Sequence, residues 1–178
     1  MTAASTQWHP GHAAGALGLE ADALDWVLEP GSMTARLRRE FPALAVRLEA
    51  QGLAVPMQDE SSRLGVPAGA PAWIRQVTLH AGDAALLQAR TVVPGWSVRN
   101  PWAELQRLGD QPLGELLFRL PGLERTPFEV ALCTRWPRNE VIGQVAPRPA
   151  RRCVFVRDGA PLLLTEQFPL LATEGPPD

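Results

Sequence analysis

Asp158 and Gly159 separate two apolar runs within residues 150–168. Asp-Gly between apolar segments is a strong signal for a two-residue β-hairpin turn. Counting back from this turn places Glu166 opposite Arg151. Glu166 shares its strand face with leucines, so its carboxylate should be buried, and a buried carboxylate is paired, protonated or functional. A structural ion pair with Arg151 is one interpretation, and contact with a ligand is another.

Two further strand-like runs lie within residues 73–93 and flank a short turn. If Gly82 and Asp83 form a two-residue turn, Arg75 lies opposite Arg90 on one face of the hairpin. Like charges directly opposite each other destabilise a sheet. We therefore expect an anion at the two guanidinium groups, either a protein carboxylate or a ligand carboxylate.

Segments bounded by Pro and Gly predict short helices near residues 22–28, 33–41, 100–108 and 113–118. About six strands in hairpins, with short helices between them, indicate an α+β domain on a single antiparallel sheet. Residues 58–71 hold two Gly, two Pro and two Ser and are expected to form a loop. The domain should span residues 21–168, between a flexible tail at residues 1–20 and a frayed tail at residues 169–178.

Composition excludes several classes of function. The 178-residue chain has no lysine, which excludes a Schiff-base lysine and a phosphate-loop lysine. A net charge of −2 gives no excess of basic residues that would bind the phosphates of nucleic acid. The three histidines and two cysteines do not have the spacing of a zinc-binding motif. No apolar run approaches the roughly 18 residues of a membrane span, and the N-terminus lacks signal-peptide features. We expect no metal, no nucleic-acid partner, no membrane span and a cytoplasmic location.

Four strings in order resemble one known family, the chorismate lyases. They are LDWVLEPGSMTARL (24–37), WIRQVTL with ARTVVP after it (73–94), LQRLGDQPLGELLF (105–118) and GAPLLLTEQF (159–168). The resemblance implies an antiparallel sheet with helices as flaps over an enclosed site. It also implies cofactor-independent elimination of pyruvate from chorismate, giving 4-hydroxybenzoate for ubiquinone biosynthesis.

The same resemblance implies how substrate is bound. Arg75 should hold the ring carboxylate, assisted by the main-chain N–H groups of Met33 and Leu113, each near a helix start. Thr34 and Gly114 should be neighbours of this end of the ligand. The two planar guanidinium groups of Arg75 and Arg90 suit the two carboxylates of chorismate, because each guanidinium can bind a carboxylate bidentately.

The catalytic residues implied are Arg90 and Glu166. Glu166 should accept a hydrogen bond from the ring hydroxyl, and Arg90 should lie at the same end, near the ether oxygen or the pyruvyl carboxylate. The family favours Gly immediately before this arginine, where the present chain has Ala89. A Gly would allow closer backbone approach to a ligand, so Ala89 is expected to affect tightness of binding more than activity.

A different class of function remains open, a module that binds an aromatic carboxylate without turning it over. Effector domains of one group of bacterial transcription regulators resemble chorismate lyases in fold. Retention of Arg75, Arg90 and Glu166 favours the enzyme. No residue pattern addresses the oligomeric state, and we expect a monomer.

Overall fold

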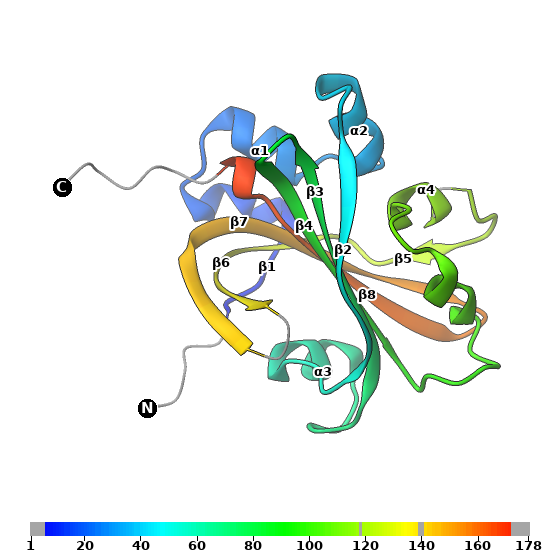
Figure 1. Cartoon of the computed structure of the whole chain (residues 1–178). Coiled ribbons are helices and arrows are strands. Elements are labelled where there is room, and N and C mark those ends of the chain that lie inside the picture. The colour runs from blue at the N-terminus through cyan, green and yellow to red at the C-terminus, as the bar shows by residue number, and fades with distance from the viewer. Residues whose placement is uncertain (1–5, 118, 139–140, 172–178) are drawn as a thin grey trace.

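The computed structural model describes residues 6–117, 119–138 and 141–171. An antiparallel sheet of eight strands has the order β1-β6-β7-β8-β4-β3-β2, with β5 paired to β7 (Figure 1). The strands are β1 (His9–Pro10), β2 (Ala45–Ala54), β3 (Ala72–Ala81), β4 (Ala84–Pro94), β5 (Glu124–Arg125), β6 (Glu129–Arg138), β7 (Val141–Arg157) and β8 (Ala160–Gln167). The predicted α+β class is confirmed, with eight strands instead of about six. The two short ones, β1 and β5, have two residues each, too few to show alternation.

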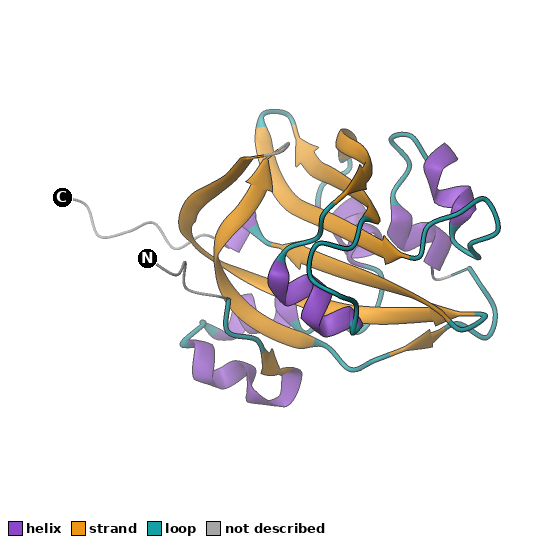
Figure 2. Ribbon diagram, turned by 90° about the horizontal axis from the view of Figure 1, so that it is seen from below, coloured by secondary structure: helices purple, strands orange, loops and turns teal. Residues whose placement is uncertain are grey.

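Short helices connect these strands. They are α1 (Ala21–Val27), α2 (Met33–Glu40), α3 (Gln58–Leu64) and α4 (Leu113–Leu117), with 3-10 helices η1 (Gly11–Leu17), η2 (Ala103–Arg107) and η3 (Pro169–Leu171). Figure 2 shows the strands curving across the molecule, with the helices around them. None of the helices within the described ranges is long and apolar enough to cross a membrane.

The sheet has two faces that matter for function. Strand register places Arg75, Ala89 and Glu166 on one face, called here the first face. The second face carries Arg90 and Thr165, which pair directly across β4 and β8. Because side chains alternate along a strand, this assignment follows from the register.

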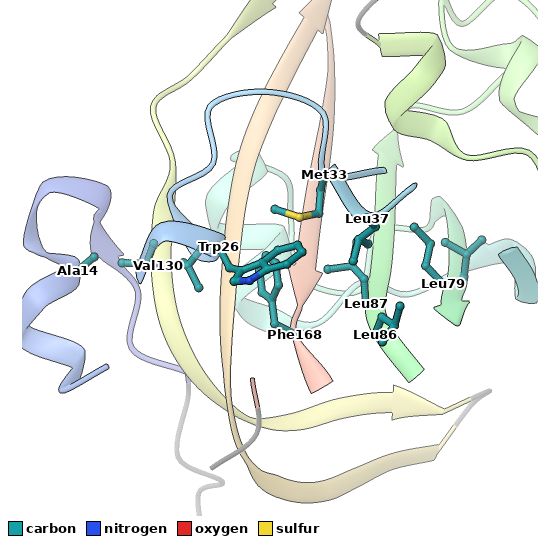
Figure 3. Packing of buried hydrophobic residues seen from close by; sticks show 11 residues of the cluster. Ala14, Trp26, Met33, Leu37, Leu79, Leu86, Leu87, Val130 and Phe168 are labelled. Atoms are coloured by element: carbon teal, nitrogen blue, oxygen red, sulfur yellow. The ribbon is translucent and has the colours of Figure 1, made fainter. Parts of the chain in front are cut away.

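The first face is covered by α1, α2 and α4 through two apolar clusters. In one, Trp26 and Met33 from the helices pack with Leu87 and Phe168 from the sheet side (Figure 3). The other joins α4 and η2 to β3, β4, β7 and β8, and its members are Trp73, Val93, Trp102, Leu105, Leu113, Leu117, Cys153, Phe155, Leu162 and Leu164. Ala89 contacts both clusters and so lies at the boundary between them.

Two segments differ from the sequence predictions. Residues 58–64 of the expected loop form α3, which begins with Asp59 and Glu60 in its first turn and ends at Gly65 in the left-handed region. Residues 9–17 of the expected flexible tail instead form β1, which pairs with β6, and η1, whose Ala14 is buried. Burial against the sheet holds these residues in place, which local composition does not reveal. Residues 1–5 and 172–178 of the predicted tails lie outside the described residues.

Candidate active site

Arg75 is a buried cation on the first face. Its side chain is 2% exposed, and Nη2 donates to the carbonyl oxygens of Gly109 at 2.9 Å and Gln111 at 2.8 Å. Its Nε is buried without a hydrogen-bond partner, and no carboxylate of the described residues forms an ion pair with it. Burial lowers the pKa of Arg75 to about 10, opposed by the negative charge of Asp110. A buried guanidinium with unused donors is suited to a carboxylate ligand.

Glu166 lies on β8 directly opposite Arg151, as the Asp-Gly turn predicted. Arg151 Nε donates to Glu166 Oε2 at 2.6 Å, and both side chains are buried. The structural ion pair therefore exists. No hydrogen bond is formed by Glu166 Oε1 within the described parts of the chain, so this oxygen is available to accept one from a ligand.

Ala89 lies between Arg75 and Glu166 on the first face. Ala89 faces Val77 on one neighbouring strand and Glu166 on the other, at the centre of the covered sheet. Ala89 is nevertheless only half-buried, so the helices above do not close over its methyl group. Arg75 is two strands away from Glu166, a separation of roughly 10 Å between strand axes. A small ligand lying over Ala89 would have a cation at one end and a carboxylate at the other.

The N-termini of α2 and α4 lie close together among the helices that cover the first face. A Cβ at Gly114 would lie 3.1 Å from Thr34 Oγ1 and 3.2 Å from Ser32 Oγ, so the absence of a side chain lets the two helices approach. Met33 and Leu113 are the first residues of these helices, and both are buried. The N–H groups of a first turn have no acceptor within their own helix. The structure thus places Met33, Thr34 and Leu113 together, with residues 109–111 linking them to Arg75.

Arg90 does not lie beside Arg75, and that prediction is wrong. A bulge between Leu79 and His80 leaves Leu86 unpaired, so Arg75 pairs with Thr91 and Gln76 pairs with Arg90. Since side chains alternate, a one-residue slip moves a side chain to the opposite face of the sheet. Arg90 therefore points away from Arg75 and Glu166.

On the second face Arg90 pairs with Glu60 of α3. Its Nε donates to Glu60 Oε1 at 2.6 Å and its Nη2 to Oε2 at 3.0 Å, while Nη1 donates to Gln76 Oε1 at 3.1 Å. Glu60 is 1% exposed and also accepts from the N–H of Met57 at 2.8 Å. The anion expected beside Arg90 is thus a protein carboxylate. The sequence reasoning missed Glu60, although Asp59 and Glu60 followed by Arg63 is the charge order of a short helix.

Two cavities open on the second face. One of about 830 Å³ is lined by residues that include Trp8, Asp59, Arg152 and Thr165. The other, of about 630 Å³, includes Arg90 in its wall. Arg75 and Glu166 line neither, because the helices of the first face cover them. Among the described residues no cluster of His, Cys, Asp or Glu is arranged to hold a metal ion.

Comparisons with known proteins show the family of the chain. A family model described as "Chorismate lyase" matches residues 5–173. A probable chorismate pyruvate-lyase of Hydrogenovibrio crunogenus is 38% identical over 81% of this chain and 80% of that protein. One from Aromatoleum aromaticum is 38% identical over 80% and 82%, and one from Ralstonia nicotianae is 38% identical over 85% and 84%.

Solved structures resemble the chain more weakly. The effector domain of PhnF from Mycobacterium smegmatis aligns with a TM-score of 0.49 and 16% identity, over 78% of this chain and 88% of that chain. The C-terminal domain of the histidine utilization repressor from Pseudomonas syringae aligns with a TM-score of 0.49 and 10% identity, over 76% and 97%. Likeness at this level assigns neither a ligand nor a function.

Proposed function

Because the chain belongs to the chorismate lyase family and is a carbon–oxygen lyase, we propose that it eliminates pyruvate from chorismate and releases 4-hydroxybenzoate. The observation that carries this proposal is Arg75, a buried guanidinium that has an unused donor and lies on the same face of the sheet as Glu166, two strands away. We further propose that the product serves ubiquinone biosynthesis, as the resemblance implied.

In this proposal Arg75 binds the carboxylate of the ring. Its buried Nε, which lacks a partner, supplies a donor that neither Gly109 nor Gln111 uses. The first-turn N–H groups of Met33 and Leu113 add donors at the same end. A carboxylate here would neutralise the buried cation, so binding gains from removing an unpaired charge as well as from the hydrogen bonds themselves.

Glu166 binds the other end of the ring. Oε2 is held by Arg151, and Oε1 accepts a hydrogen bond from the ring hydroxyl, which becomes the phenol of the product. As the ether bond breaks, the hydrogen leaves the hydroxyl-bearing carbon and enolpyruvate departs to become pyruvate. Aromatisation drives the step, so the protein contributes chiefly positioning and electrostatic stabilisation.

Arg90 enters the proposal through the strand that carries Ala89. Its guanidinium fixes Glu60, and with it α3, against the second face directly behind the proposed site. We propose that Arg90 supports turnover from this position. Arg90→Ala should then lower turnover far more than it lowers affinity for 4-hydroxybenzoate. Equal losses of the two would oppose this role.

The test is to mix purified protein with chorismate without added metal. Equimolar 4-hydroxybenzoate and pyruvate, formed above the spontaneous rate, would support the proposal. Glu166→Gln should remain folded but bind product more weakly, because a neutral amide is a poorer acceptor than a carboxylate. Binding of 4-hydroxybenzoate by the unchanged chain without turnover would refute the lyase and favour the binding module.

A further inference from the structure

Arg151 is a buried side chain whose contacts converge on Glu166. It lies on β7, is 2% exposed, and its Nε donates to Glu166 Oε2 at 2.6 Å. Its Nη1 donates to the carbonyl oxygen of Glu29 at 2.5 Å and approaches that of Val27 at 3.5 Å. One guanidinium therefore joins the proposed catalytic carboxylate to the chain segment between α1 and α2.

These anchors are well matched to a cation. Val27 is the last residue of α1, and the last carbonyl groups of a helix lack intrahelical partners and carry partial negative charge. The rings of Phe128 and Phe168 flank the guanidinium carbon at 4.3 Å and 5.9 Å. Carbonyl oxygens thus bind one nitrogen of the Arg151 guanidinium, and two aromatic rings pack against the same group.

The geometry of the pair determines which oxygen of Glu166 remains for a ligand. A guanidinium is planar and rigid, so a fixed Arg151 also fixes the carboxylate that it binds. By occupying Oε2 it leaves Oε1 as the free acceptor. It also places a positive charge beside the buried carboxylate, which offsets part of the cost of burying that carboxylate.

We propose that Arg151 is a positioning residue of the lyase reaction, which acts on the substrate only through Glu166. This inference rests on the proposed function of the Arg75 and Glu166 site. Arg152, its neighbour in sequence, provides a matched control. Arg152 is 6% exposed and points to the second face, where it pairs with Glu129 at 3.0 Å and Asp59 at 3.3 Å.

The experiment is a double-mutant cycle on kcat/KM for chorismate, with Arg151→Gln, Glu166→Gln and the double variant. If Arg151 acts through Glu166, each single variant loses about tenfold or more, and the double variant is within about twofold of Glu166→Gln. Arg151→Lys, which keeps the charge, should recover part of the loss. Arg152→Gln should retain kcat within about threefold, although it too removes a buried ion pair.

Multiplication of the two single losses in the double variant would overturn the inference, because Arg151 would then act independently of Glu166. Full activity of Arg151→Gln would overturn it as well. If Arg151→Gln does not fold, the comparison of Glu166→Gln with the double variant still decides, since the double variant leaves no unpaired buried charge. Absence of turnover by both the unchanged chain and Arg152→Gln would instead refute the proposed function itself.

Discussion

Arg75 and Arg90 are buried arginines on adjacent strands, 2% and 4% exposed, and the same substitution should cost much more stability at Arg90 than at Arg75. Arg90 is paired with Glu60, whereas Arg75 binds carbonyl oxygens and forms no ion pair with the residues described in the structure. Arg90→Met leaves the Glu60 carboxylate buried without its ion-pair partner. Breaking a buried pair in this way lowers the free energy of unfolding by about 3–5 kcal/mol. Arg75→Met leaves no buried carboxylate of the described residues without an ion-pair partner.

The magnitude for Arg75 follows from its pKa, which burial lowers to about 10. Relative to its ordinary value, that shift corresponds to about 3 kcal/mol of penalty on the charged form. The penalty is complete below about pH 10 and disappears only as the pH rises towards the ordinary value. At neutral pH, Arg75→Met removes it but loses two hydrogen bonds of about 1–3 kcal/mol each. The net change in the free energy of unfolding should therefore lie between a gain of about 1 and a loss of about 3 kcal/mol, less than the cost of Arg90→Met.

Urea unfolding with and without 4-hydroxybenzoate measures both effects. Without ligand, the midpoint of Arg90→Met should fall below that of Arg75→Met by about 1 M or more. Saturating product at about 100 times its Kd adds about 2.7 kcal/mol to the unchanged chain, and Arg75→Met should lose this gain. Adding Glu60→Met to Arg90→Met should recover stability. If Arg75→Met costs as much as Arg90→Met without ligand, Arg75 is a structural cation and the reasoning fails.

Three further outcomes are expected. Gly114→Ala should weaken product binding, since its Cβ would press on two side chains at the start of α2 at 3.1 and 3.2 Å; Gly15→Ala, which meets nothing within 4 Å, is its control, and equal affinities would contradict the close approach. Cys133 and Cys153, each with a pKa raised by burial to about 12, should resist alkylation at pH 8 until urea unfolds the chain; rapid labelling of the native protein would contradict their burial. Ser32→Ala should lower the free energy of unfolding by about 1 kcal/mol, because it removes the hydrogen bond that caps the N-terminus of α2. Thermal unfolding measures this effect, and an unchanged melting temperature would argue against the cap.

The two hairpins show how far local patterns reach. The Asp158–Gly159 turn has the predicted two-residue form, and the pairing of Arg151 with Glu166 followed from counting along the strands. The turn near Gly82 was also located, but its register changes at a bulge a few residues away. A bulge depends on strand twist and on packing around the extra residue, here Leu86, and no residue in the turn encodes it.

Of the charged residues at the site, some were predicted from the sequence and one was not. The residue types of the site, two arginines and a glutamate in strands that alternate, were visible in the sequence. Glu60 was not assigned, because its segment has the composition of a loop and becomes α3 only by packing beneath the sheet. A helix of this length gains most of its stability from tertiary contacts and little from propensity.

The sequence by itself determined the α+β class, the hairpins, the family motifs and the burial of Glu166, since each follows from alternation, turn chemistry or residue order over a short stretch. Only the tertiary structure decided that Arg90 forms an ion pair with a carboxylate, whereas Arg75 forms none with any residue that the structure describes. The physical reason is that a one-residue shift in strand register moves each side chain of a strand to the opposite face of the sheet. That shift is set by the packing of the whole sheet.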